Sequence, residues 1–338
     1  MLKSLSESSP LWDIFTLKNE YNTNIGDNKS PIFDRPVVSE YLIENGFCPE
    51  YPDRKRFAIC LSHDVDEIYP PSTHVGRSII SSVAKRDASI LRHAFKGVFN
   101  KKNSPYLNFS EIIKLEAKYG AKSTFFFLAK GEDPLRFRYA IEDIPSELGR
   151  IVDDGCEVGL HGGYHSFDDY EKLREEKRGL EGVLNRSIKG YRGHYLNLHI
   201  PNTWNFLAKL GFEFDSTLGY RRAQGFRNGM CHPFTPFDPI LKKKMGLLEI
   251  PLNIMDAAFN EIVLDPSRHW GVIEKMMQSV EENRGVLTIN WHNDSLLSFS
   301  KSEYKLIYEK ILSEGMRRGA WLTSCEEIHK WWSEHYEF

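Results

Sequence analysis

The chain contains the stretch FAICLSHDVDEI, residues 57–68, in which five apolar side chains lead into His63, Asp64 and Asp66. A continuous apolar run, without alternating polar residues, indicates a strand that is buried on both faces, as in a parallel sheet. In parallel α/β folds, the residues that follow the strand ends carry the chemistry. This stretch therefore predicts a buried parallel strand with a candidate site at its C-terminal end.

Similar apolar runs recur along the chain, and helical patterns lie between many of them. The runs are STFFFLAK (123–130), CEVGLHGG (156–163), KGYRGHY (189–195), FEFDST (212–217), LLEIPLNIMD (247–256), GVLTINWH (285–292) and AWLTSCEE (320–327). Capping residues and glycines place the expected helices at 110–119, 166–184, 201–211, 266–283 and 301–318. About eight strands alternating with helices predict an α/β fold, either a distorted (β/α) barrel of 7–8 strands or an open doubly wound sheet.

Three segments do not fit this alternation. Residues 1–56 are expected to form an N-terminal extension that packs on a barrel domain of residues 57–338. Residues 69–109 form an insertion, whose basic stretch 77–102 can be a lid, a solvated helix or a helix on a membrane surface. Residues 221–245 form a long aromatic and basic loop, and loops of this length are uncommon unless they are functional or disordered.

The side chains of this loop can bind a ligand or can have an ordinary structural role. Arg221, Arg222 and Arg227 can bind an anionic group, such as the phosphate of a nucleotide- or lipid-linked sugar, or they can be solvated. Its aromatic residues and Trp291 can line a sugar-binding cleft or pack in the core; those in the loop are Phe226, Phe234 and Phe237.

Composition excludes several classes of protein. The 338 residues are 41% hydrophobic and 27% charged, as in an ordinary globular protein, and the net charge of -3 gives no support to nucleic-acid binding. The five cysteines are scattered and form no CxxC pair, which favours free thiols in a reducing compartment. No secretory signal and no membrane span is visible, so the sequence predicts a cytoplasmic protein.

Ionisable residues gather at the predicted strand ends, where a core seldom tolerates unpaired charge. His161 and His165 are four residues apart, and such a pair can present two imidazoles to one cation, with Asp66 or Asp64 as a third ligand. The alternative is a pair of surface histidines at a helix start. However, Gly162 and Gly163 between them are costly in an ordinary helix.

These residues resemble the NodB-homology polysaccharide deacetylases, the carbohydrate esterase family 4, from about Phe57 to Ser324 apart from the insertion. That family has five motifs in order: T-F-D-D-G, H-[ST]-x-x-H, R-x-P-Y, an Asp-Ser near a strand end, and L-x-x-H. Their counterparts here are Ser62–Asp66, His161–His165, Arg192–Tyr195, Asp215-Ser216 and Leu287–His292. The chain departs from the pattern at Val65, Gly162 and His194.

The resemblance implies a distorted (β/α) barrel and a divalent metal, with zinc expected, held by Asp66, His161 and His165. It implies Asp64 as general base, although the roles of Asp64 and Asp66 can be exchanged because Val65 occupies the usual ligand position. The remaining implied roles are Arg192 orienting Asp64, the Tyr195 backbone N–H binding the oxyanion, His292 protonating the leaving amine, and Asp215 orienting His292.

Each of these roles has an ordinary structural alternative. Arg192 can form a surface ion pair, Tyr195 can simply pack, and Asp215 can cap a loop. His292 can occupy a core position, and His63 and His194 are interpreted as supporting or core residues.

The resemblance further implies removal of an N-acetyl or O-acetyl group from a sugar during cell-surface polysaccharide synthesis. A deformylase or another amide hydrolase on the same scaffold is one alternative. Because valine cannot bind a metal, a non-catalytic glycan-binding relative without the metal is another. The expected partner is an N-acetylated sugar or glycan, free or linked to a nucleotide or lipid, with membrane contact left open.

Overall fold

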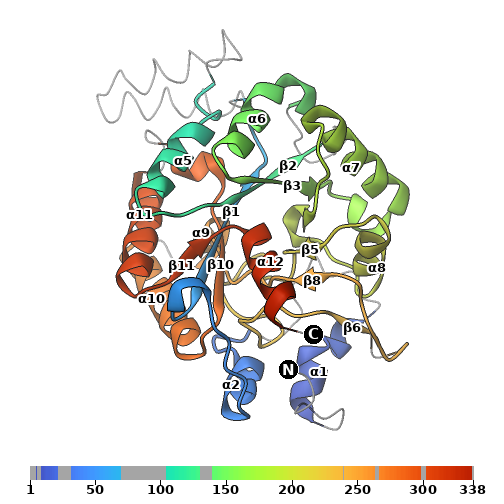
Figure 1. Ribbon diagram of the computed structural model, residues 1–338, viewed down its shortest axis with the longest axis vertical. Coiled ribbons are helices and arrows are strands. Elements are labelled where there is room, and N and C mark those ends of the chain that lie inside the picture. Colours follow the sequence, from blue (N-terminus) through green and yellow to red (C-terminus); the bar gives the residue numbers. More distant parts are fainter. Residues whose placement is uncertain are drawn as a thin grey trace.

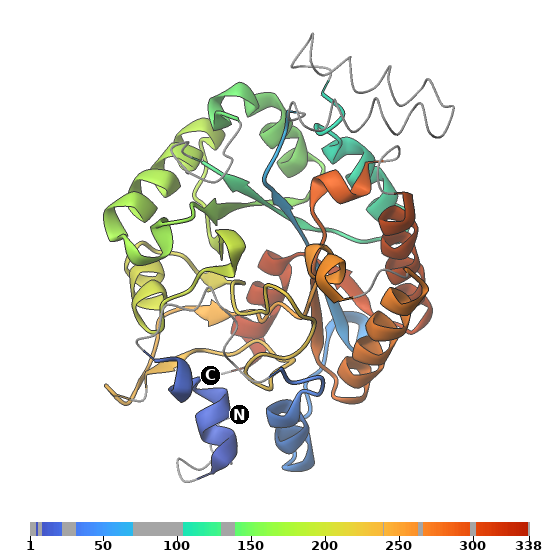
Figure 2. The same ribbon diagram turned by 180° about the vertical axis from the view of Figure 1, so that it is seen from behind.

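The computed structural model describes residues 5, 9–21, 32–69, 104–129, 139–238, 240–262, 266–297 and 302–336. Within them, a curled sheet of parallel strands is surrounded by helices (Figures 1 and 2). Most of the predicted insertion, residues 70–103 with the basic stretch 77–102, lies outside the described residues. No helix in the described ranges is both long enough and apolar enough to cross a membrane.

The strands follow one another around the sheet in nearly the order of the chain. They are β1 (Ala58–Val65), β2 (Thr124–Leu128), β3 (Glu157–Gly162), β4 (Gly190–Gly193), β5 (Phe214–Asp215), β8 (Leu248–Glu249), β9 (Ile254–Met255), β10 (Val286–Asn290) and β11 (Trp321–Thr323). The order is β8-β5-β4-β3-β2-β1-β10-β9, and β11 lies beside the first half of β1. The predicted distorted (β/α) barrel is confirmed.

The helices that cover the outside of the sheet come mainly from the segments between the strands. They are α5 (Phe109–Ala117), α6 (Pro145–Asp153), α7 (Tyr170–Leu184), α8 (Asn202–Lys209), α9 (Asp256–Ile262), α10 (Pro266–Glu282) and α11 (Ser302–Arg317). The last helix, α12 (Cys325–His335), instead crosses one mouth of the barrel (Figure 1). Two N-terminal helices, α1 (Pro10–Phe15) and α2 (Val37–Glu44), lie below the barrel in this view.

The run 247–256 forms two short strands, β8 and β9, where the sequence predicts one. Pro251 lies between them and has no N–H to give to a sheet ladder. In the connecting segment, the N–H of Leu252 donates to the carbonyl of Leu218 at 2.9 Å, and that of Asn253 donates to Thr288 at 3.0 Å. The two edges of the sheet are thereby joined, and the sheet closes almost into a ring.

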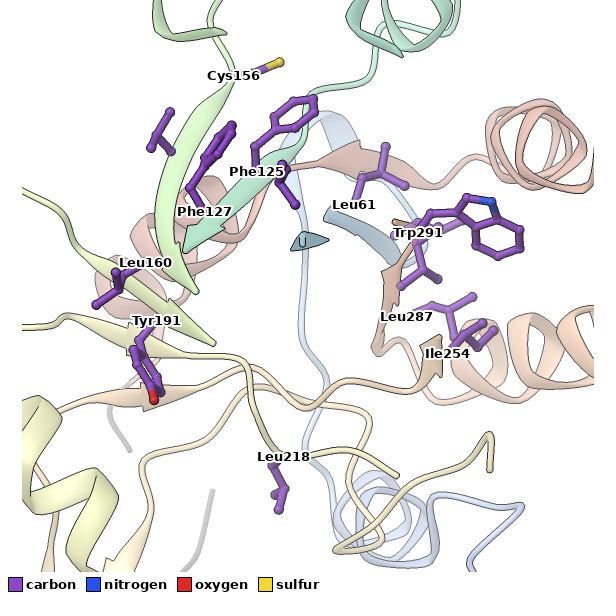
Figure 3. Packing of buried hydrophobic residues seen from close by; sticks show 14 of the residues in the cluster. Leu61, Phe125, Phe127, Cys156, Leu160, Tyr191, Leu218, Ile254, Leu287 and Trp291 are labelled. Atoms are coloured by element: carbon purple, nitrogen blue, oxygen red, sulfur yellow. The ribbon is translucent and has the colours of Figure 1, made fainter. Parts of the chain in front are cut away.

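Successive residues of each strand face opposite sides of the sheet, as the geometry of extended chain requires. Ile59 and Leu61 of β1 belong to the large core cluster between strands and outer helices, part of which Figure 3 shows. Ala58 and Cys60 belong to a second cluster, which fills the barrel beneath α12 and includes Trp332 of that helix. The interior is therefore apolar at the end where the strands begin.

The N-terminal segment packs on the long loop 221–245. Trp12 and Phe15 of α1 contact Phe237 and Phe234, with ring centroids 5.1 and 5.2 Å apart. The guanidinium of Arg227 donates to Glu20 at 3.0 Å, and both side chains are buried. Arg227, Phe234 and Phe237 therefore bind the N-terminal segment of the chain. Phe226 and Trp291 are fully buried in the core, so of the two alternatives for them, core packing is the one observed.

Two buried carboxyl groups, Asp215 and Glu249, lie side by side where β5 pairs with β8. The indole Nε1 of Trp204 in α8 lies 3.0 Å from an oxygen of each. Burial raises the pKa of both groups, and the adjacent Asp215 raises the pKa of Glu249 further, well above its usual value. Two adjacent negative charges are thereby disfavoured, and a proton shared between Glu249 and Asp215 is favoured.

This pair predicts a specific pH dependence of stability. Glu249 has a higher pKa in the folded than in the unfolded chain, so its contribution is present below the unfolded value and is lost as the pH rises toward the folded value. Glu249→Gln cannot ionise and should not lose this contribution. The difference in free energy of unfolding, variant minus wild type, should therefore increase by about 1.4 kcal/mol for each unit of pH between the two pKa values. Urea unfolding between pH 5 and 8 measures this difference.

The matched control is Glu142→Gln, because Glu142 is exposed and should leave the pH dependence unchanged. Equal pH dependence in Glu249→Gln and the wild type would show that Glu249 is ionised in the folded chain.

Candidate active site

Three side chains converge at the C-terminal ends of the strands. They come from Asp66, directly after β1, His161 in β3, and His194, directly after β4. One ligand atom from each lies within 4.8 Å of the other two. Oδ1 of Asp66 is 3.3 Å from Nε2 of His161 and 3.7 Å from Nε2 of His194. Ligand atoms of a tetrahedral zinc site with bonds of about 2.0–2.1 Å lie about 3.3–3.4 Å apart, so these residues fit such a metal.

The hydrogen bonds of His161 strengthen the case for a cation. Its Nδ1 lies 2.9 Å from the backbone carbonyl of Arg192, which can only accept, so Nδ1 carries the proton. In the neutral ring, Nε2 then presents a lone pair to Asp66, whose Oδ1 is buried and has no hydrogen-bond partner. Two lone pairs that face each other at 3.3 Å repel unless a proton or a metal ion lies between them.

His165, the sequence-predicted third ligand, is not part of this group. It is exposed, and its ring packs on Tyr164 with centroids 4.8 Å apart. The four-residue spacing does not act as a helical spacing, because β3 continues through Gly162 and the chain then turns, with the Ser166 N–H donating to the Gly163 carbonyl at 3.0 Å. His194, interpreted from the sequence as a supporting or core residue, occupies the third position instead.

The glycines of HGGYH are explained by packing. A Cβ on Gly162 would lie 2.3 Å from the Tyr191 hydroxyl oxygen, and one on Gly163 would lie 2.6 Å from Glu176 Oε1. The N–H of Gly163 also donates to Glu176 Oε2 at 3.1 Å. The Ser or Thr of the family motif at position 162 therefore has no room beside Tyr191 in this chain.

Asp64 lies beside the trio and is held from two directions. Its Oδ1 accepts from Nη1 of Arg192 at 3.0 Å, and its Oδ2 accepts from the Asn290 side-chain amide at 2.7 Å. Oδ2 also lies 3.7 Å from Nε2 of His161, at the edge of the metal position. Val65 points into the core between Asp64 and Asp66, and this alternation places both carboxylates inside the barrel.

Arg192 is fully buried, and its hydrogen bonds hold the guanidinium in one orientation. Beyond Asp64, it donates to Oγ of Ser62 at 2.7 Å and to the carbonyl and hydroxyl oxygens of Ser216 at 2.9 and 2.8 Å. Its guanidinium lies 4.5 Å above the ring of Phe126. The predicted contact with Asp64 is present, and the alternative of a surface ion pair does not apply.

His292 approaches the trio from β10, and its carboxylate partner is Asp256. Nδ1 of His292 lies 2.6 Å from Oδ1 of Asp256, which leaves Nε2 facing the site, 3.8 Å from Oδ2 of Asp66. Burial lowers the pKa of His292, but Asp256 and then the site carboxylates outweigh it and raise the pKa to about 10. The imidazole is therefore cationic at neutral pH and is oriented to give up a proton at Nε2.

The predicted partner of His292, Asp215, lies elsewhere. Phe214 faces the barrel interior, so the next residue, Asp215, faces the outer layer, where it meets Trp204 and Glu249. Asp256 ends the apolar run 247–256, and that position was the only signal in the sequence that could have identified it. His63, as interpreted, is a core residue: its ring nitrogens lie 2.6 Å from the Trp291 carbonyl and 2.8 Å from Glu116.

These groups line one cavity of about 240 Å³. Its walls are formed by the two aspartates, His161, His194 and His292, together with Tyr195, Leu196, Arg221, Arg222, Met255 and Ala257. Tyr195 has the left-handed backbone angle φ 56°, and its ring packs on His194 with centroids 4.4 Å apart. The cavity is slightly smaller than the roughly 300–1,000 Å³ pockets of drug-sized ligands.

No family model matches the sequence, and no curated protein matches it either. Solved structures do match. A protein of Mycobacterium smegmatis, described as a polysaccharide deacetylase, is 18% identical with a TM-score of 0.57, over 83% of this chain and 92% of the other. A second such protein, from Pseudomonas aeruginosa PAO1, is 15% identical with a TM-score of 0.58, over 87% and 97% of the two chains.

PuuE allantoinase is similar to the same degree, with 14% identity and a TM-score of 0.58 over 87% of this chain and 96% of the allantoinase. At these identities the likeness is one of fold. The resemblance to polysaccharide deacetylases that the motifs indicate is thus confirmed in the architecture: the chain has the distorted barrel of these deacetylases and of the allantoinase.

Proposed function

We propose that this protein is a metal-dependent hydrolase that removes an acetyl group from an N-acetylated sugar. The observation that carries the proposal is one cavity in which a metal-ligand trio, an arginine-held carboxylate and a carboxylate-held histidine face one another. The fold shared with deacetylases supports the same class of reaction. The cytoplasmic location and the role in polysaccharide synthesis stay predictions from the sequence.

Asp66, His161 and His194 would hold the metal, and the donor set of two imidazoles and one carboxylate suits zinc. A divalent cation at this position supplies Lewis-acid chemistry and lowers the pKa of a bound water. Asp64 lies next to this position and, in the proposal, takes the proton of the attacking water as general base. Arg192 and Asn290 keep Asp64 in place.

The leaving amine needs a proton as the C–N bond breaks, and His292 is the residue that can supply it. Asp256 fixes the tautomer by binding Nδ1, so the proton at Nε2 faces the cavity. Tyr195, in the cavity wall, provides the backbone N–H that is proposed to bind the acyl oxygen as it becomes negative.

A second candidate is hydrolysis of another amide on the same scaffold. The similarity in fold to PuuE allantoinase, a protein whose name indicates a different substrate from a polysaccharide, favours keeping it. The site chemistry is common to both candidates, because each needs an activated water, a base and an acid. A substrate panel that includes formylated and acetylated amino sugars separates them.

Metal content tests the ligand assignment. After reconstitution with Zn²⁺ and dialysis, the wild-type chain should retain about one zinc ion, and His161→Ala and His194→Ala should each retain almost none, because a site of two protein ligands binds weakly. His165→Ala is the matched control from the same motif and should retain the metal. Full zinc content in His194→Ala, or its loss in His165→Ala, would contradict the assignment.

Acetate release tests the catalytic role of Asp64. Asp64→Asn keeps the hydrogen-bonding shape of the side chain but cannot take a proton, so acetate release from N-acetylated sugars should fall by about 10²–10⁴-fold. Zinc content and the circular dichroism spectrum should be unchanged. A wild-type chain that binds zinc and glycan but releases neither acetate nor formate would be a non-catalytic binder.

The pH profile distinguishes Asp256 from Asp215. The acid His292 must be protonated, so activity falls as the pH rises through its pKa; Asp256→Asn removes the main group that raises this pKa. The alkaline limb of kcat should therefore move to lower pH, with a loss of about 10²-fold in rate. Asp215→Asn should leave the limb in place. A shift in Asp215→Asn alone would restore the assignment implied by the resemblance.

A further inference from the structure

A short hairpin in the long loop exposes apolar and basic side chains that the proposed reaction does not use. Its strands are β6 (Phe237–Asp238) and β7 (Lys243–Lys244), which pair in antiparallel register. The hairpin projects from the side of the barrel between α8 and α1 (Figures 1 and 2). Its sequence is FDPILKKK, residues 237–244, so two adjacent aliphatic residues at a protruding turn are followed directly by three lysines.

The turn of the hairpin is held in shape by Asp238. Its Oδ1 accepts hydrogen bonds from the backbone N–H groups of Ile240 and Leu241, both at 2.9 Å. The two aliphatic side chains are nevertheless 66% and 61% exposed. Among the large hydrophobic residues exposed in the described ranges, these two are adjacent in the sequence. Scattered exposed hydrophobic residues are ordinary on a protein surface, whereas a neighbouring pair on a fixed, protruding turn favours a contact with a partner.

The exposed charge of the hairpin is positive. Asp238 is its one carboxylate and is buried, whereas Lys242, Lys243 and Lys244 are exposed. Among the residues that the structure describes, no carboxylate forms an ion pair with Lys243 or Lys244. Successive residues of an extended strand point to opposite sides, so these two ammonium groups flank the ribbon on both sides. The whole chain has a net charge of -3, so this basic turn is a local exception.

We propose that this hairpin binds the surface of an anionic lipid bilayer, with Ile240 and Leu241 inserted at the acyl boundary and Lys243 and Lys244 at the headgroups. Aliphatic side chains gain free energy on entering the acyl region, and lysines beside them are attracted to anionic headgroups. The long lysine stems can reach the headgroups while the turn itself lies at the interface. The inference goes beyond the proposed function and does not depend on it, because binding to lipid needs no turnover.

The size and charge of the tip favour a bilayer over a second protein. Specific protein interfaces bury about 1,200–2,000 Å² in total, and charged residues are depleted from their cores. The hairpin instead offers two adjacent aliphatic side chains next to three ammonium groups. In a symmetric contact with a second copy of this chain, lysines would face lysines, and like charges repel. A bilayer accepts the aliphatic and the basic groups together, because its acyl chains and anionic headgroups lie in adjacent layers.

The first measurement is co-sedimentation of the purified full chain with vesicles of phosphatidylcholine, alone or mixed with phosphatidylglycerol. A high lipid concentration is used, because two inserted side chains give only reversible binding. The chain should bind the mixed vesicles at about 0.1 M salt and leave them at about 1 M salt, since screening shortens the reach of the lysine charges from about 10 to about 3 Å. Absence of binding to the mixed vesicles at low salt would overturn the proposal.

Hairpin variants locate the contact. Ile240→Ser/Leu241→Ser should weaken binding to the mixed vesicles by about 10-fold or more. Lys243→Gln/Lys244→Gln should weaken it by about 5-fold for each lysine removed. The circular dichroism spectrum should stay unchanged in both variants, because the replaced side chains are exposed. Binding that persists in both would assign membrane contact to another surface, such as the basic stretch 77–102, and would overturn the proposal.

Matched controls separate the hairpin from exposed residues elsewhere. Leu306→Ser removes an aliphatic side chain that is 66% exposed on α11, and Lys114→Gln/Lys118→Gln removes two exposed lysines at α5. Both should bind the mixed vesicles like the wild type. Sedimentation velocity without lipid tests the other occupant. A wild-type dimer that Ile240→Ser/Leu241→Ser dissociates would assign the tip to a second copy of the chain instead.

A fluorophore at the tip tests insertion directly. Cys48 is exposed and the other four cysteines are buried, so Cys48→Ser leaves no exposed thiol. In that background, Leu241→Cys labelled with an environment-sensitive dye should shift its emission to the blue when mixed vesicles are added. Leu306→Cys, labelled in the same way, should show no shift. No shift at Leu241→Cys, or an equal shift at both positions, would contradict insertion of the hairpin.

Discussion

The two-residue repeat of extended chain decides which side chains meet in this barrel. In β1, β3, β4 and β10, one set of alternate residues packs beneath the outer helices, and the other set points inward. Asp64, His161, Arg192 and Asn290 all belong to the inward set, and Asp66, His194 and His292 continue it past the strand ends. Because the strands of the curled sheet pair in parallel, these side chains meet at the same mouth of the barrel.

The interior changes character along the barrel axis. At the end where the strands begin, Ala58, Cys60 and Phe126 pack with Trp332 beneath α12. Above them lies Arg192, whose guanidinium rests on Phe126 and donates four hydrogen bonds to Ser62, Ser216 and Asp64. A buried charge is tolerated only where hydrogen bonds and an opposite charge compensate its desolvation. Arg192 thus joins the apolar half of the interior to the charged half.

In the charged half of the interior, two ionised side chains are paired with a side chain of opposite charge. The position beside Asp66 is the one where a cation is proposed. Asp64 is paired with Arg192, and His292 is paired with Asp256. Asp66 and the two Nε2 atoms that face it lie at separations that a metal of zinc size would fill. The site is therefore organised around three charge pairings, two made by the protein and one proposed for a bound ion.

Much of the fold follows from local sequence. The apolar runs predict the long strands β1, β2, β3 and β10 because a strand buried between the barrel interior and the helices needs apolar residues on both faces. They do not predict that residues 247–256 break into two strands. That break depends on Pro251 and on backbone bonds to residues far away in the chain, Leu218 and Thr288.

The residues of the candidate site are likewise predicted only in part from the local sequence. The sequence by itself places Asp64, Asp66, His161, Arg192 and His292 at strand ends, since the apolar run before each residue marks where its strand stops. Only the tertiary structure decides that His194 replaces His165 and that Asp256 replaces Asp215. For His165 the deciding factor is the turn that follows β3, and for Asp215 it is the face of β5 opposite the interior residue Phe214. Both depend on packing with Tyr191, Glu176 and Trp204, which come from other parts of the chain and which no local spacing encodes.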